Sequence, residues 1–152
     1  RTRPDGEIAV HAVDIEPAAV ECARRNLDGI PGGVHLGDLF EPLPAELAGA
    51  VDVLLANMPY VPTDALALMP AESRDHEPRV TTDGGSDGLD LIRRVAQEAA
   101  RWLRLGGTLL VETGEDQADA VVATFAAHGL VPTVHHDDER GATVVSAISR
   151  PS

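Results

Sequence analysis

The segment ANMPYVP, residues 56–62, contains the side chains of this sequence best suited to holding a small polar group. Asn57 offers a side-chain carbonyl as an acceptor, and the backbone carbonyl of Met58 offers a second one. Two acceptors that converge on one planar NH2 group hold both of its protons, which turns the nitrogen lone pair towards an electrophile. Pro59 fixes its own φ and keeps Met58 extended, while the ring of Tyr60 can stack on an amide or a base. The segment therefore predicts a site that presents an amide-type nitrogen, with a simple turn asparagine as the alternative.

Two carboxylates follow other apolar runs and suit the polar parts of a nucleotide-like ligand. Asp14 lies at the end of AVHAVDI, where an acid can accept hydrogen bonds from ribose hydroxyls. Asp38 lies in GDLF, where a carboxylate can meet the exocyclic amine of an adenine with Leu39 against the ring face. Each acid also has a structural interpretation. Asp14 would be favoured by the dipole of a following helix, and Asp38 would cap loop amides.

Apolar periodicity and turn residues predict the elements that position these side chains. Strands are expected at 9–15, 33–38, 49–57, 107–113, 130–136 and 142–149. Helices are expected at 16–27, 89–105 and 116–129, the second of them ended by Gly106 and Gly107. This alternation predicts an α/β fold with a mostly parallel, doubly wound sheet and a C-terminal antiparallel hairpin. Between the third strand and the second helix, residues 58–88 form a long segment with four prolines, and loops of that length are usually functional or disordered.

The chain opens almost directly on a strand, with no glycine-rich turn before it. In an open α/β sheet the ligand site lies at a topological switch point, normally next to the first strand. If the strand at 9–15 is not the first one, an upstream strand and its loop are expected.

Composition narrows the possible functions. The 152 residues suffice for one domain, and the 12 basic and 25 acidic residues give a formal net charge of −13. Such a surface repels phosphate backbones, so nucleic acid is a disfavoured partner. A single cysteine cannot form an internal disulfide, and no apolar run approaches the length of a membrane span. The expected location is the cytoplasm, without a membrane partner.

The order of these motifs resembles the protein-(glutamine-N5) methyltransferases, which modify a glutamine of peptide-chain release factors with S-adenosylmethionine. The resemblance covers essentially the whole chain, through VHAVDIEPAAVECARRNL, GDLFEPL, VDVLLANMPYVP, HEPRVTTDGGSDGLDLIRRV and LRLGGTLLVETGEDQADAV. It implies a Rossmann-like class I methyltransferase fold and a protein substrate that carries a glutamine.

The resemblance also implies a role for each candidate residue. Asp14 would hold the ribose of S-adenosylmethionine, and Leu39, beside Asp38, would lie at the adenine. The substrate amide would be held by the four residues Asn57, Met58, Pro59 and Tyr60, of which Asn57 would also contact the cofactor. No metal site is expected, because the adjacent His135 and His136 would face opposite ways on a strand.

Two departures from the family pattern stand out. Met58 occupies the place of the first proline of the family's Asn-Pro-Pro-Tyr motif, although its carbonyl is retained. The family's first strand, its glycine-rich loop and its N-terminal helical domain have no counterpart in this sequence. Residues 1–152 are therefore expected to be the C-terminal part of a catalytic domain, which alone would bind S-adenosylmethionine weakly or not at all.

Two other functions remain open from the sequence. A nucleic-acid base N-methyltransferase would use a related motif, with the base flipped onto the aromatic ring. A non-catalytic interaction module with a methyltransferase-like fold would explain the absent glycine-rich loop and Met58, but not the retained Asp14, Asn57 and Tyr60. The sequence does not indicate an oligomeric state.

Overall fold

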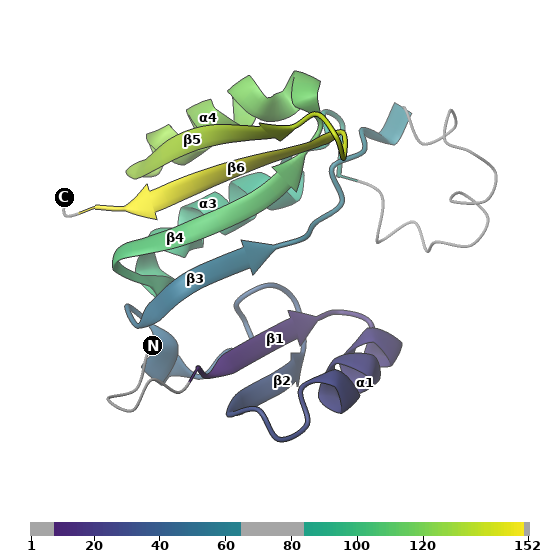
Figure 1. Ribbon diagram of the computed structural model, residues 1–152, viewed down its shortest axis with the longest axis vertical. Helices are drawn as coiled ribbons and strands as arrows, with labels where there is room; N and C mark the ends of the chain where they lie inside the picture. The colour runs from purple at the N-terminus through teal and green to yellow at the C-terminus, as the bar shows by residue number, and fades with distance from the viewer. Residues whose placement is uncertain (1–7, 65–83, 151–152) are drawn as a thin grey trace.

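The computed structural model describes residues 8–64 and 84–150 (Figure 1). In these ranges β-strands and α-helices alternate, and short 3-10 turns lie at Ala45–Leu47 and Glu115–Gln117. The strands are β1 (Val10–Asp14), β2 (Gly32–Leu36), β3 (Val51–Ala56), β4 (Leu103–Thr113), β5 (Leu130–Asp137) and β6 (Ala142–Ser149). The helices are α1 (Pro17–Asn26), α3 (Asp90–Trp102) and α4 (Ala118–Ala127). Much of the long segment between β3 and α3, including Pro70 and Pro78, lies outside the described residues.

The strands form two sheets. β1 and β2 pair in parallel, and a four-stranded sheet has the order β3-β4-β6-β5. Within it β3 and β4 are parallel, whereas β6 is antiparallel to both β4 and β5. The predicted α/β fold with a C-terminal antiparallel hairpin is confirmed. In Figure 1, β1 is the strand of the small sheet that lies nearer to β3, but the two strands are not paired.

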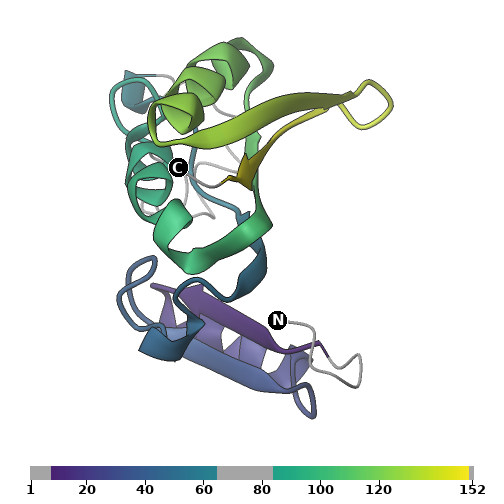
Figure 2. The ribbon, with the colours of Figure 1, turned by 90° about the vertical axis from the view of Figure 1, so that its left-hand side faces the viewer.

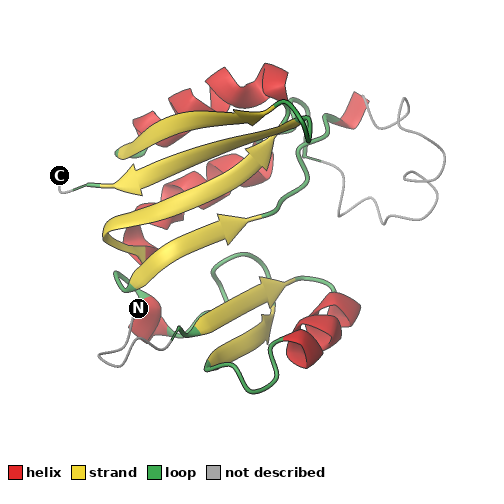
Figure 3. Cartoon of the chain, viewed as in Figure 1, coloured by secondary structure: helices red, strands yellow, loops and turns green. Residues whose placement is uncertain are grey.

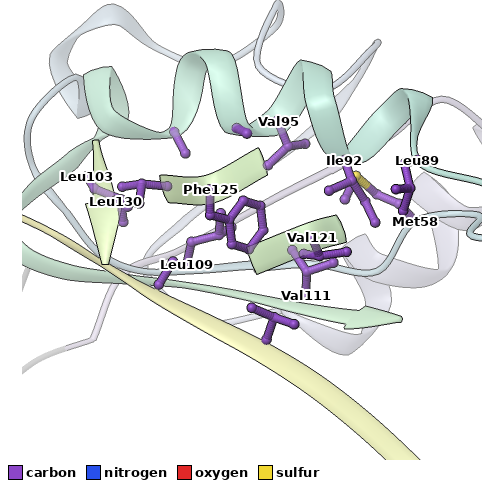
Figure 4. Packing of buried hydrophobic residues seen from close by; sticks show 14 of the residues in the cluster. Met58, Leu89, Ile92, Val95, Leu103, Leu109, Val111, Val121, Phe125 and Leu130 are labelled. Atoms are coloured by element: carbon purple, nitrogen blue, oxygen red, sulfur yellow. The ribbon is translucent and has the colours of Figure 1, made fainter. Parts of the chain in front are cut away.

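The core lies between the four-stranded sheet and the helices α3 and α4. Figure 2 shows both helices on the same side of this sheet. Their apolar residues recur at helical spacing, and the sheet supplies alternate residues of β4 and β6, as amphipathic elements require. Figure 4 shows the interior, whose fully buried side chains include Ile92, Val95, Leu109, Val111, Val121, Phe125 and Val145. Burying one large apolar side chain of this kind contributes about 1.5–3 kcal/mol. The core therefore fixes the orientation of the loops at the ends of β3 and β4.

The opposite face of β3 is apolar and exposed. Val53 and Leu55 are 57% and 75% exposed, whereas Leu54 and Ala56 between and after them pack against the core. Successive strand residues point to opposite faces of a sheet, which explains the alternation. In the part of the chain that the structure describes, no element covers Val53 and Leu55.

The boundary between α3 and β4 differs from the prediction. The helix was expected to continue to residue 105 and to end at two glycines, but it ends at Trp102. Leu103 already pairs with Val51 of β3, and the register shifts before Val53 pairs with Thr108. A Cβ on Gly107 would lie 2.7 Å from the Val51 carbonyl oxygen, so this glycine permits a close approach of the two strands. The double glycine is therefore part of a strand irregularity, because tertiary pairing outweighs the local helical pattern.

No helix among the described residues is both long enough and apolar enough to cross a membrane.

Candidate functional site

The parallel strands bring the candidate residues towards one end of the molecule. Figure 3 shows the arrowheads of β1, β3 and β4 at the same end, where loops follow each strand. Asp14 is the last residue of β1, Asn57 directly follows β3, and Gly114 directly follows β4. The carboxyl ends of parallel strands are where open α/β folds bind their ligands.

Asn57 is exposed at the end of β3. Within residues 8–64 and 84–150, no hydrogen bond to its side chain is formed, so both its carbonyl and its NH2 group are open to a ligand. Asn57 also follows a well-packed strand, which fixes its backbone. This combination suits a binding residue better than a turn asparagine, whose side chain ordinarily bonds to the local backbone.

Met58 is 7% exposed and belongs to the hydrophobic core. Figure 4 places its side chain beside Ile92 and Leu89. The residue that replaces the family's proline thus anchors the segment by burial, where a proline would stiffen it by its ring. Pro59 and Tyr60, which follow, are half-buried.

Tyr60 lines a pocket of about 350 Å³ that no sequence pattern predicted. The pocket lies between the end of β4 and the turn that joins β5 to β6. Its other lining residues are Glu112, Thr113, Gly114, Glu115, His136, Asp137, Asp138, Gly141, Ala142 and Thr143. The polar segment that follows the predicted strand 107–113 could have indicated this pocket. Asp14 and Asn57 were predicted as site residues because each lies at the end of a strand, and this segment has the same position.

Four carboxylates make this pocket acidic: Glu112, Glu115, Asp137 and Asp138. Arg140 donates to Asp137 at 2.6 Å, and this hydrogen bond holds the pKa of the Asp137 carboxyl below its usual range. Asp137 is thus paired with Arg140, and the three other carboxylates keep the pocket acidic, which disfavours a phosphate-bearing ligand there.

Asp14 has a structural role as well as an exposed position. One of its carboxylate oxygens accepts a hydrogen bond from the backbone N–H of Glu16 at 2.8 Å, directly before α1. The structural role of Asp14 is therefore to close the turn before α1, and the residue lies outside the first turn of the helix. Because the residue is exposed, its carboxylate remains accessible to a ligand.

Asp38 lies in the loop after β2, because this strand ends at Leu36 and not at Asp38 as predicted. Its carboxylate accepts a hydrogen bond from Arg94 of α3 at 2.7 Å. That bond raises the pKa of Arg94 and joins the loop to the core helix. No local pattern predicts this pair, and a role of Asp38 towards adenine stays a prediction.

Leu39 has a φ of +47°, and no other non-glycine residue in the described ranges has a positive φ. A bulky residue in this region is uncommon and costs on the order of 1–3 kcal/mol. Backbone strain of this kind is concentrated at ligand sites and clamps. The side chain of Leu39 packs against the core, and its position beside a bound ring stays a prediction.

The two ends of the segment between β3 and α3 are joined at their base. The backbone N–H of Gly84 donates to the carbonyl of Val61 at 2.9 Å, and that of Thr63 donates to the carbonyl of Gly85 at 2.9 Å. Asp87, a little further along, accepts a hydrogen bond from Arg93 at 3.0 Å. The residues after Tyr60 and those before α3 therefore form one unit.

The pair formed by Asp87 and Arg93 makes stability depend on pH. The hydrogen bond from Arg93 holds the pKa of Asp87 below its ordinary value. Because the pKa is lower in the folded state, the stabilisation is present above the ordinary aspartate pKa of about 4 and is lost as the pH falls through the folded value. The variant Arg93→Ala is therefore expected to lower the midpoint of thermal unfolding at neutral pH, with a smaller effect at about pH 2.

The control for this experiment is Arg25→Ala, since the hydrogen bond of Arg25 goes to the thiol of Cys22 and not to a carboxylate. An effect of Arg93→Ala that has the same size at both pH values would contradict the assigned pair.

Comparison with solved structures defines the class of the fold. A methyltransferase from Pyrococcus furiosus matches 94% of this chain and 64% of its own, with a TM-score of 0.68 and 14% identity. The antibiotic-resistance methyltransferase Kmr matches 91% of this chain and 74% of its own, with a TM-score of 0.52 and 17% identity. The fold is that of the class I methyltransferases, as the sequence predicted.

Within the methyltransferases, the proteins most similar in sequence among those compared are glutamine methyltransferases. The ribosomal protein uL3 glutamine methyltransferase of Burkholderia pseudomallei is 42% identical over 131 residues, which are 81% of this chain and 42% of that protein. The release factor glutamine methyltransferases of Geobacter sulfurreducens and Moorella thermoacetica are 38% and 46% identical, over 87% and 74% of this chain. In sequence the chain is a relative of the protein glutamine methyltransferases. It spans less than half the length of these relatives, and no family model matches it.

Proposed function

We propose that this chain is part of an S-adenosylmethionine-dependent methyltransferase that modifies the side-chain amide of a glutamine in a protein. The observation that carries the proposal is Asn57. It directly follows β3 at the ligand-binding end of a methyltransferase fold, exposed and with its hydrogen-bonding groups open. The similarity in sequence to glutamine methyltransferases supports the same assignment.

The residues at the ends of β1 and β2 fit the polar parts of S-adenosylmethionine. The exposed carboxylate of Asp14 suits two ribose hydroxyls, and the strained Leu39 provides an apolar side chain beside the expected adenine. Asp38 and Asn57 complete the proposed cofactor contacts. When bound, the cofactor supplies a methyl group on a sulfonium, which is an electrophile that needs no activation.

In the proposed site, the chain's own residues act mainly by positioning the acceptor. The side-chain carbonyl of Asn57 and the backbone carbonyl of Met58 each accept one proton of the substrate amide. Both protons then lie in one plane, and the nitrogen lone pair is turned towards the methyl donor. Pro59 limits the backbone, and Tyr60 stacks on the amide. Holding reactants in this way is worth large rate factors. When the nitrogen gains the methyl group, it releases one of its two protons to solvent.

The acceptor is proposed to be a protein and not a nucleic acid. Glu112, Glu115 and Asp138 line the pocket beside Tyr60, and a flipped base would bring its phosphates towards them. The named substrates of the relatives, release factor and ribosomal protein uL3, are proteins of translation. A cytoplasmic location belongs to the same proposal.

We further propose that residues 1–152 form the C-terminal part of a catalytic domain. The chain spans less than half of its relatives, and β1 and β3 are unpaired with each other while Val53 and Leu55 are exposed. A further strand between β1 and β3 would join the two sheets, and further polypeptide on the exposed face would cover Val53 and Leu55. Titration calorimetry is expected to show weak or no binding of S-adenosylmethionine to these residues alone, and micromolar affinity would contradict the proposal.

The function is tested by incubating the longest natural form of the protein with S-adenosylmethionine and, separately, a release factor, uL3 and RNA. Mass spectrometry is expected to locate one methyl group on a glutamine side chain. The control substrate carries asparagine at that position and should remain unmodified. Methylated RNA would favour the nucleic-acid alternative. No transfer, together with binding to a protein, would favour the non-catalytic module.

A further inference from the structure

Gln117 is a buried side chain next to the candidate site with all its hydrogen-bonding groups in use. It lies between β4 and α4 and is 8% exposed. Its Oε1 accepts from the backbone N–H of Gly114 at 3.2 Å and from the hydroxyl of Thr113 at 3.3 Å. Its Nε2 donates to the backbone carbonyls of Tyr60 and Asp87, both at 2.9 Å. A glutamine amide has two donor hydrogens and an acceptor oxygen with two lone pairs, so every position is satisfied.

These bonds join three segments that are far apart in the sequence. The amide oxygen of Gln117 accepts from residues at the end of β4. The amide nitrogen donates to the ANMPY segment and to the chain just before α3. The orientation of the amide is fixed, since a backbone N–H must face its oxygen and two carbonyls must face its nitrogen. Rotating the Gln117 amide by half a turn would place its oxygen against the carbonyl oxygens of Tyr60 and Asp87. Leaving these buried acceptors without a donor is costly.

Gly88 shows how closely these segments approach. A Cβ at this position would lie 2.2 Å from the Tyr60 carbonyl oxygen and 2.4 Å from Gln117 Nε2, and the residue has a φ of +78°. Only glycine fits without displacing the hydrogen-bonded groups. Close packing of Gly88, just before α3, therefore keeps Gln117 and Tyr60 in contact, in addition to the hydrogen bonds at the end of β4.

We propose that Gln117 is the positioning residue of the acceptor site. By holding the carbonyl of Tyr60, it fixes the far end of the segment whose near end is anchored by β3. Asn57 and the Met58 carbonyl, which lie between these two anchors, then keep the orientation that the substrate amide requires. This inference rests on the proposed function and adds a residue that acts through the ANMPY segment without touching substrate.

The variant Gln117→Glu tests the proposal, because glutamate has nearly the same shape but its carboxylate cannot donate. The acceptor bonds from Thr113 and Gly114 can persist, whereas the carbonyls of Tyr60 and Asp87 lose their donor. The value of kcat is expected to fall about 10- to 100-fold, as for a small misplacement of reacting groups. The KM for S-adenosylmethionine is expected to change far less. The matched control is Gln97→Glu, which makes the same change on the exposed face of α3 and should leave kcat unaltered.

Thr113→Val is a milder second variant that removes only the hydroxyl bond to Gln117 and keeps its two donor bonds. A smaller fall of kcat with normal thermal unfolding supports the proposal even if Gln117→Glu does not fold. Unchanged kcat in a folded Gln117→Glu variant overturns the proposal. A rise in the KM for S-adenosylmethionine by the same factor as the fall in kcat also overturns it. All measurements use the longest natural form of the protein. Absence of transfer in the unaltered protein would instead contradict the proposed function, so the two failures are distinguishable.

Discussion

Replacing Asn57 with alanine is expected to lower kcat for methyl transfer by a factor on the order of 10²–10³. The side chain is exposed at the end of β3 and makes no hydrogen bond within the described residues, so its removal leaves the fold intact. The substrate amide loses one of the two acceptors that fix its protons, and the nitrogen lone pair is no longer directed. Transfer of labelled methyl to the substrate protein measures the effect, and thermal unfolding verifies the fold.

The control for this experiment is Asn26→Ala, since Asn26 is the other asparagine of the chain and is exposed at the end of α1. It should retain the full rate. An Asn57→Ala variant that also retains the rate would show that the amide is held elsewhere, and the proposed role of the ANMPY segment would be wrong.

Changing Asp14 to asparagine is expected to raise the Kd for S-adenosylmethionine by about 10-fold or more. Hydrogen bonds to a charged group are worth about 1.5–3 kcal/mol, and 1.4 kcal/mol corresponds to a tenfold change. Asparagine is the informative substitution, because its side-chain oxygen can still accept from the Glu16 N–H and keep the start of α1. The loss then reports on the ligand and not on the helix. Calorimetric titration of the longest natural form of the protein gives the Kd.

Asp28→Asn is the matched control, because it removes an exposed carboxylate in the loop after α1. Its Kd should equal that of the unaltered protein. If Asp14→Asn also binds with unaltered affinity, the carboxylate serves only the turn before α1, and the ribose would have to be held by other groups.

The sequence alone determined the order and type of the elements. Apolar alternation and helical periodicity are local properties, and they predicted the helix that became α1 and the hairpin of β5 and β6. The position of Asn57 immediately after a buried strand was also readable, because parallel strands present their carboxyl ends at one edge. Trp102 and Phe125 lie within the predicted helices 89–105 and 116–129, and both are buried.

The tertiary structure decided the contacts between distant segments. Gly106 and Gly107 looked like a helix stop, but pairing with β3 places them within β4. Asp38 suggested an adenine contact or a cap of loop amides, and the structure pairs it with Arg94, 56 residues further along the chain. Gln117 gave no signal, because a glutamine between a strand and a helix is ordinary until two distant carbonyls face its NH2 group. Periodicity records only which face of an element is buried, whereas hydrogen-bond partners depend on how those faces meet in space.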